Sequence, residues 1–178
     1  MRSHNGMKPQ DCVILLKIID YGSSPWMAKE LAQAAGLSPG EVSFSLERSR
    51  YAMLLNESKR RVNTRAFLDF LVHGLRVVFP VHVGGIVRGI PTAWSASPLS
   101  RSFPDANPVV WPSDQGTLRG ESIEPLYANS IASLIEQPSF HELLALVDAL
   151  RIGRAREADL ASKILRERFD EYARLAEH

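Results

Sequence analysis

Cysteine is almost absent from this sequence, and no long hydrophobic run occurs in it. The one cysteine, Cys12, excludes an internal disulfide and a cysteine-based metal cluster. It lies in the apolar run Cys12–Leu16, which favours a small buried thiol over a reactive one. The longest apolar stretches are far shorter than the ~20 residues that a membrane span requires. Residues 1–10 are polar and show no apolar signal core, so we expect a cytoplasmic protein without membrane association.

Sequence motifs of enzymes are also missing. Gly84, Gly85 and Gly89 lack the strand-and-helix setting of a nucleotide-binding loop, and the serines from 95 to 102 are not part of a nucleophile elbow. The histidines show no metal-binding spacing, and a core or surface role suits each of them better than ligation: they are at positions 4, 73, 82, 141 and 178. We therefore expect no catalytic residues, no metal and no cofactor, and a protein that is not an enzyme.

Net charge is close to zero, at +1, which argues against a protein that coats nucleic acid by bulk charge. The charges are unevenly distributed along the chain. Residues 1–90 carry 12 basic and 7 acidic side chains, a net charge of +5, whereas residues 91–178 carry 9 and 13, a net charge of −4. The first half is therefore suited to a polyanionic partner and the second half to another task.

Helical periodicity dominates the first half. We expect a first helix over 11–21 and a second over about 25–35. A third helix begins at Ser38, and a fourth covers 64–75. Ser38–Glu41 forms a capping box with proline at the first helical position, which is a strong start signal.

The middle of the chain predicts little regular structure. Residues 53–55 are typical of a short strand, and 77–79 and 81–83 of extended segments. From 84 to 125 the chain is rich in glycine, proline and serine, and we expect a long irregular connection with short strands near 86–87 and 109–110.

Two helices are expected to close the chain. Ser139 and Glu142 have the spacing of a second capping box, and Gly153 separates the helix that follows from another over 154–176. The predicted fold class is mainly α with a small β component. It comprises a winged helix-turn-helix domain over 9–90 and, over 91–178, an irregular connection with C-terminal helices.

The most specific motif covers residues 27–48. Small and apolar side chains recur where two crossing helices and their turn need them, at Leu31, Ala32, Gly36, Leu37, Val42 and Leu46. The pattern resembles the helix-turn-helix of winged-helix transcription regulators such as the MarR-like group. A helical corner that serves only protein contacts is the alternative interpretation.

This resemblance implies that the helix from Ser38 enters the major groove of double-stranded DNA. Its first turns would then meet base edges through Ser38, Pro39, Gly40, Ser43, Phe44 and Glu47. Phe44 is suited to a thymine methyl and equally to the protein core. Glu47 would repel phosphates unless it reads a cytosine amino group.

Basic side chains follow the motif. They are expected to contact phosphates, with a solvated charge run as the alternative: Arg48, Arg50, Lys59, Arg60, Arg61 and Arg65. The wing departs from the family pattern, because residues 53–66 show no two clear strands joined by a glycine-rich turn. A degenerate wing, or one supplied by 77–87, would account for this.

The second half offers a different kind of partner. Trp94, Trp111 and Tyr127 have the character of interface anchors, although local covering of the core is the simpler interpretation. Residues 143–165 have a general likeness to antitoxin-type regulators encoded beside nucleotidyltransferase-like toxins. The sequence thus predicts a homodimeric DNA-binding regulator, most simply a repressor. The alternative is an antitoxin or adaptor that neutralises a toxin-like partner enzyme through its C-terminal half and also regulates its own gene.

Overall fold

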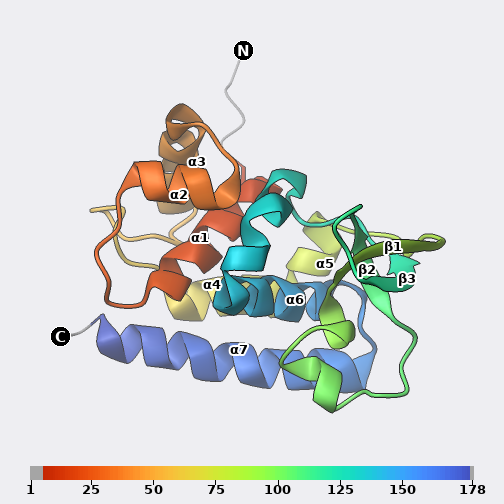
Figure 1. Ribbon diagram of the computed structural model, residues 1–178. Helices are drawn as coiled ribbons and strands as arrows, with labels where there is room; N and C mark the ends of the chain where they lie inside the picture. The colour runs from red at the N-terminus through yellow and green to blue at the C-terminus, as the bar shows by residue number, and fades with distance from the viewer. Residues whose placement is uncertain (1–5, 177–178) are drawn as a thin grey trace.

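The computed structural model describes residues 6–176, and it is mainly helical with one small three-stranded sheet (Figure 1). This confirms the fold class in its coarse form. The elements in chain order are α1 (Pro9–Tyr21), α2 (Ala28–Ala35), α3 (Pro39–Tyr51), α4 (Thr64–His73), α5 (Leu75–Val78), β1 (Ile86–Pro91), the 3-10 helices η1 (Ala93–Ser95) and η2 (Leu99–Arg101), β2 (Val109–Pro112), β3 (Leu118–Ser122), η3 (Ala128–Glu136), α6 (Pro138–Ile152) and α7 (Ala155–Leu175).

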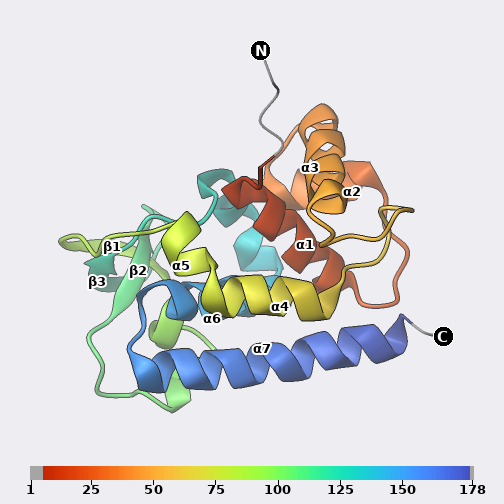
Figure 2. The same ribbon diagram turned by 180° about the vertical axis from the view of Figure 1, so that it is seen from behind.

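Helix α1 lies at the centre of the helical layer and is buried from Asp11 to Ile19. It packs on α2 and α3 on one side and on α6 on the other, which explains its apolar character all around. Helix α7 runs along α4 and α6 in both views (Figures 1 and 2). Phe67 of α4 stacks on Phe169 of α7 with ring centroids 5.7 Å apart. The hydrophobic core is therefore continuous between residues before and after position 90.

The sheet closes on itself. Strand β1 pairs antiparallel with both β2 and β3, and β2 and β3 pair parallel with each other. Ile90 lies opposite Trp111 on one side of β1, and Arg88 lies opposite Arg119 on the other.

A buried polar cluster attaches this sheet to α6. The carboxylate of Asp148, which is almost fully buried, accepts hydrogen bonds from Thr92 Oγ1 at 2.8 Å and from Trp111 Nε1 at 2.7 Å. Its other oxygen pairs with Arg151 at 2.9 Å, and Arg151 also donates to the carbonyl of Glu124. Every polar atom of the buried carboxylate thus has a donor, which offsets the cost of removing it from water.

Two predictions for the middle of the chain need correction. Val77 and Val78 are helical in α5 rather than extended, because Leu75 is buried and Arg76 donates to the carbonyls of Leu150 and Gly153 at the end of α6. These tertiary contacts outweigh the β-propensity of the two valines. The segment 84–125 is also more regular than expected, since β3 was not predicted.

The capping box predicted at Ser139 is wrong. Helix α6 begins at Pro138, with Gln137 in the cap position and no side-chain cap bond. Glu142 instead accepts a hydrogen bond from Ser97 at 2.7 Å and pairs with Arg168 of α7 at 2.5 Å. The Glu142 carboxylate therefore forms contacts with residues distant in the sequence, which the spacing of Ser139 and Glu142 does not predict.

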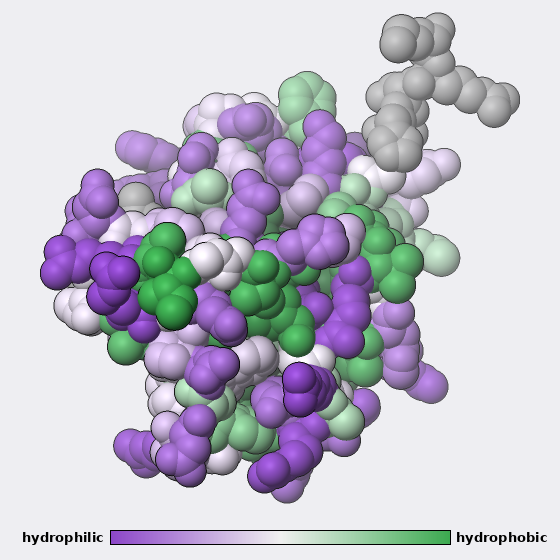
Figure 3. Space-filling view, turned by 90° about the vertical axis from the view of Figure 1, so that its right-hand side faces the viewer, coloured by the Kyte–Doolittle hydropathy of each residue, from purple (hydrophilic) through white to green (hydrophobic). Residues whose placement is uncertain are grey.

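The sheet end of the molecule exposes apolar side chains among polar ones, and Figure 3 shows this face. Val77 is 79% exposed, Val83 48% and Ile86 66%. Val77 lies in α5, Val83 in the connection that follows and Ile86 at the start of β1. This end of the molecule is far from α3 in Figures 1 and 2.

Across residues 6–176, none of the helices combines the length and the apolar composition needed to cross a membrane.

Candidate nucleic-acid interface

The turn between α2 and α3 depends on Gly36. This residue has φ +66° and ψ +34°, a left-handed conformation that glycine adopts without a steric penalty. The amide of Leu37 then donates to the carbonyl of Ala32 at 2.9 Å and closes the end of α2. A β-carbon at position 36 would lie 2.6 Å from the carbonyl oxygen of Asn129 in η3, so the close approach of η3 also requires glycine.

Helix α3 begins with the capping box that the sequence predicts. The Ser38 hydroxyl accepts from the Glu41 amide at 3.2 Å, and the Glu41 carboxylate accepts from the Ser38 amide at 2.9 Å. These hydrogen bonds hold the pKa of Glu41 below its usual value. The inner face of α3 carries Val42 and Leu46, which belong to the core. The start and orientation of the helix are therefore fixed by its cap and its buried face.

The outer face of α3 is free of packing contacts at the positions expected to meet base edges. Ser38, Pro39, Gly40 and Ser43 are exposed. Phe44 is 69% exposed, which excludes the interpretation that this ring belongs to the core. An aromatic side chain with this exposure on a fixed helix is available for contact with a partner.

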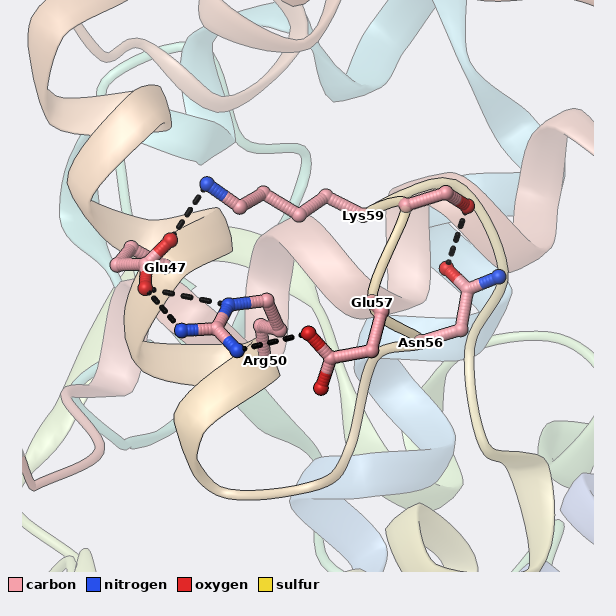
Figure 4. A network of polar contacts seen from close by, with 6 residues as sticks. Glu47, Arg50, Asn56, Glu57 and Lys59 are labelled. Carbon is pink, nitrogen blue, oxygen red and sulfur yellow. Dashed lines mark hydrogen bonds and ion pairs between the residues drawn. The ribbon is translucent and has the colours of Figure 1, made fainter.

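Glu47 lies at the centre of an ionic network that joins α3 to the following loop (Figure 4). Its carboxylate pairs with Arg50 Nη2 and with Lys59 Nζ, each at 2.5 Å, and Arg50 Nη1 pairs with Glu57 at 2.9 Å. Hydrogen bonds from Arg50 and Lys59 lower the pKa of Glu47 to about 2. Two carboxylates thus neutralise the two cations, and Glu47 is not free to read a cytosine. Arg50 and Lys59 carry less uncompensated charge than their sequence positions indicate.

Arg48 does not face outward with the rest of the predicted basic set. Its guanidinium is directed inward and donates from Nε to Asp11 Oδ2 at 2.8 Å and from Nη2 to Oδ1 at 2.5 Å. The Asp11 side chain is fully buried, and that of Arg48 is 13% exposed. A buried carboxylate needs a cation within reach, and Arg48 supplies it. The prediction of a phosphate contact at Arg48 is corrected to a core ion pair with α1.

The loop after α3 is closed by a single antiparallel bridge between Leu55 and Val62 rather than by two strands. Asn56 Oδ1 accepts from the amides of Arg60 and Arg61 and holds the turn together. The loop is therefore held by one bridge and one side chain and does not form a two-stranded hairpin. Residues 77–87 do not supply a wing, because they form α5 and the start of β1 at the other end of the molecule (Figure 1).

Three arginines of the predicted set remain exposed around this loop. The guanidinium of Arg60 stacks 4.5 Å above the ring of Trp26 and donates to the carbonyl of the same residue at 2.9 Å. Arg61 and Arg65 are exposed and form no side-chain hydrogen bond or ion pair within residues 6–176. Stacking holds Arg60 in place without neutralising it, so all three cations are available to an anion.

Two participants were missed at the sequence level. Trp26 falls within the helix predicted from about residue 25, but α2 begins only at Ala28, and the role of Trp26 appears only when the loop folds back onto it. Glu57 lies among the basic side chains that follow the motif, and it neutralises Arg50. The i, i+7 spacing of Arg50 and Glu57 crosses the end of a helix, so no sequence rule predicts their contact.

In the part of the chain described here, residues 6–176, no group of three or more histidine, cysteine or acidic side chains is arranged to hold a metal ion. Comparison of the chain with protein-family models, with curated proteins and with solved structures found no match.

Proposed function

We propose that the protein is a sequence-specific transcriptional regulator of the winged helix-turn-helix type, which acts as a dimeric repressor and places α3 in the major groove of double-stranded DNA. The observation that carries the proposal is the two-sided character of α3. Its inner face and its N-terminal cap are fixed by the protein, while the outer face with Ser43 and Phe44 stays open to a partner.

Different side chains serve different parts of the contact. Ser43 offers a hydroxyl to base edges, and Phe44 offers an apolar surface to a thymine methyl. Arg60, Arg61 and Arg65 supply charge to the phosphate backbone. Such contacts set the position of the protein on the duplex, and base contacts set the sequence that is read.

The test is fluorescence anisotropy with DNA fragments from upstream of the gene for this chain and with a scrambled duplex. Phe44→Ala should reduce the preference for the specific fragment by about 5- to 150-fold, which corresponds to the ~1–3 kcal/mol that one mismatched base pair typically costs. Arg61→Ala should weaken binding to both duplexes and reduce the salt slope by about 1. The matched control is Lys163→Ala, an exposed cation on α7. Absence of specific binding by the wild type, or equal binding by all variants, contradicts the proposal.

A second function, neutralisation of a partner enzyme by an antitoxin or adaptor, is favoured by the sheet end of the molecule. Ile86 is 66% exposed beside the cross-strand pair Arg88 and Arg119, two like charges that lie directly opposite each other. Such a pair is unfavourable in the free protein, and an acidic, partly apolar protein surface would relieve the repulsion. Co-purification with the product of the adjacent gene tests this function. Ile86→Glu should abolish the complex and leave DNA binding intact, whereas Val72→Ala should preserve both.

A further inference from the structure

A cavity of about 680 Å³ lies between the small sheet and η3. Its walls come from β1, β2, the end of β3 and η3. Ile90 and Ile123, which are 8% and 1% exposed, form part of its apolar lining. The volume falls within the range of roughly 300–1,000 Å³ that is typical of small-molecule sites.

The charges of the lining have one sign. Asp114 and Glu124 contribute carboxylates, and among the described residues of the lining there is no lysine or arginine. The side chains of both acids are without an ion pair in the described part of the chain. His82 contributes an imidazole to the same lining. A ligand with an apolar body and a positive group therefore fits this lining, and an organic anion does not.

One wall of the cavity also touches the turn of the helix-turn-helix. Ala128 and Ile131 of η3 line the cavity, while Asn129 between them approaches Gly36. Asn129 Nδ2 donates to the Gly36 carbonyl at 3.4 Å, and the space beside Gly36 is too small for a β-carbon. Asn129 is therefore the point at which a displacement of η3 at the cavity would reach the turn before α3.

We propose that this cavity binds a small organic cation, an apolar ring that carries a protonated amine, and that its occupation weakens DNA binding through η3 and the turn at Gly36. The effect on DNA rests on the proposed function, whereas the binding of the cation does not. A ligand shifts the position of η3 only if it binds the displaced arrangement more tightly, and couplings of this kind usually amount to 5- to 150-fold.

The binding step is tested on the full chain with two probes that share one ring system. Tryptamine carries an ammonium group and indole-3-acetate carries a carboxylate. Tryptamine should shift the methyl NMR signals of Ile90 and Ile123 and raise the melting temperature, and indole-3-acetate should do neither. Asp114→Asn together with Glu124→Gln should weaken tryptamine binding at least tenfold, and Asp105→Asn, an exposed carboxylate outside the cavity, should not. Equal binding of the two probes, or shifts that avoid these isoleucines, overturns the proposal.

The coupling step has a readout that does not require DNA. Tryptamine should shift the amide signals of Gly36 and Leu37 in the free protein. Asn129→Gly should remove these shifts and keep the shifts at Ile90 and Ile123. In the presence of specific DNA, tryptamine should lower the affinity of the wild type at least fivefold and that of Asn129→Gly much less. Unchanged signals at Gly36 overturn the coupling, whereas a wild type that binds tryptamine and shifts Gly36 but binds no DNA refutes only the proposed function.

Discussion

Arg48 and Asp11 form a two-point ion pair between α3 and α1, with a fully buried carboxylate as its acceptor. The planar guanidinium matches both oxygens of Asp11, so the pair contributes to the rotation of α3 and to its distance from α1, together with the buried face of Val42 and Leu46. This rotation determines that Ser43 and Phe44 face outward. Arg48, which the sequence predicts to contact DNA, thus contributes instead to the orientation of the exposed face of α3.

Arg48→Ala should lower the free energy of unfolding by about 3 kcal/mol, because it leaves the buried carboxylate of Asp11 without its cation. Urea denaturation followed by circular dichroism measures the change. Arg65→Ala, which removes an exposed arginine without an ion pair in residues 6–176, should stay within about 0.5 kcal/mol of the wild type. If the Arg48→Ala protein is as stable as the wild type and loses only its affinity for DNA, the original prediction of a phosphate contact at Arg48 is supported instead.

Two glycines of the same motif should respond in opposite directions to alanine. Gly36→Ala places a β-carbon at positive φ and against the backbone of Asn129, so it should destabilise the fold by more than about 1 kcal/mol. Gly40→Ala is the matched control, since its β-carbon would meet nothing closer than Ser38 Oγ at 3.9 Å. It lies in helix α3 and should stabilise by up to about 1 kcal/mol. The melting temperatures of the two variants measure the difference. Equal changes in the two variants would contradict the requirement for glycine at position 36.

Glu47→Gln should increase the affinity for DNA of any sequence. The substitution releases Lys59 and Arg50 from their shared carboxylate, so these cations become available to phosphates. The slope of log affinity against log salt should steepen by about 1 to 2, measured by anisotropy between low and moderate salt. Asp69→Asn, an exposed acid on α4, controls for the change in net charge. An unaltered slope would mean that the two cations stay away from the DNA.

The same ion pairs predict a pH dependence. The pKa of Glu47 is about 2 in the folded chain, against an ordinary value of 4.5, because Arg50 and Lys59 donate to its carboxylate. A lowered pKa means that the network contributes to stability at neutral pH and loses this contribution as the pH falls from about 4.5 through 2. Carbon-13 NMR of the Glu47 carboxyl should show the low midpoint. Arg50→Ala with Lys59→Ala should raise it toward 4.5, and a midpoint already near 4.5 in the wild type would exclude the network in solution.

Thr92→Val should cost about 1.5 to 3 kcal/mol of unfolding free energy. The two side chains have the same shape, but valine lacks the hydroxyl that donates to the buried carboxylate of Asp148. Thr117→Val, at an exposed position before β3, is the control. Chemical denaturation compares the two. A neutral result at Thr92 would mean that Trp111 and Arg151 satisfy Asp148 by themselves.

Local sequence rules predicted the elements that are stabilised by local interactions. The start of α3 followed from Ser38 and Glu41, whose reciprocal bonds span three residues, and the turn followed from Gly36, which adopts a positive φ. The same kind of rule failed at Ser139, because Glu142 is engaged by Ser97 and Arg168 instead. Strand β3 was not predicted, because its pairing with β1 joins residues about thirty positions apart in the sequence.

The sequence by itself determined the mainly helical class, the position of the helix-turn-helix pattern and the excess of positive charge before residue 90. The tertiary structure decided which of those charges are free. Asp11 binds Arg48, Glu47 and Glu57 neutralise Arg50 and Lys59, and Arg60, Arg61 and Arg65 remain exposed. The physical reason is that a charge is compensated by whichever opposite charge lies within a few ångströms in space, and Asp11 is 37 residues from its partner along the chain.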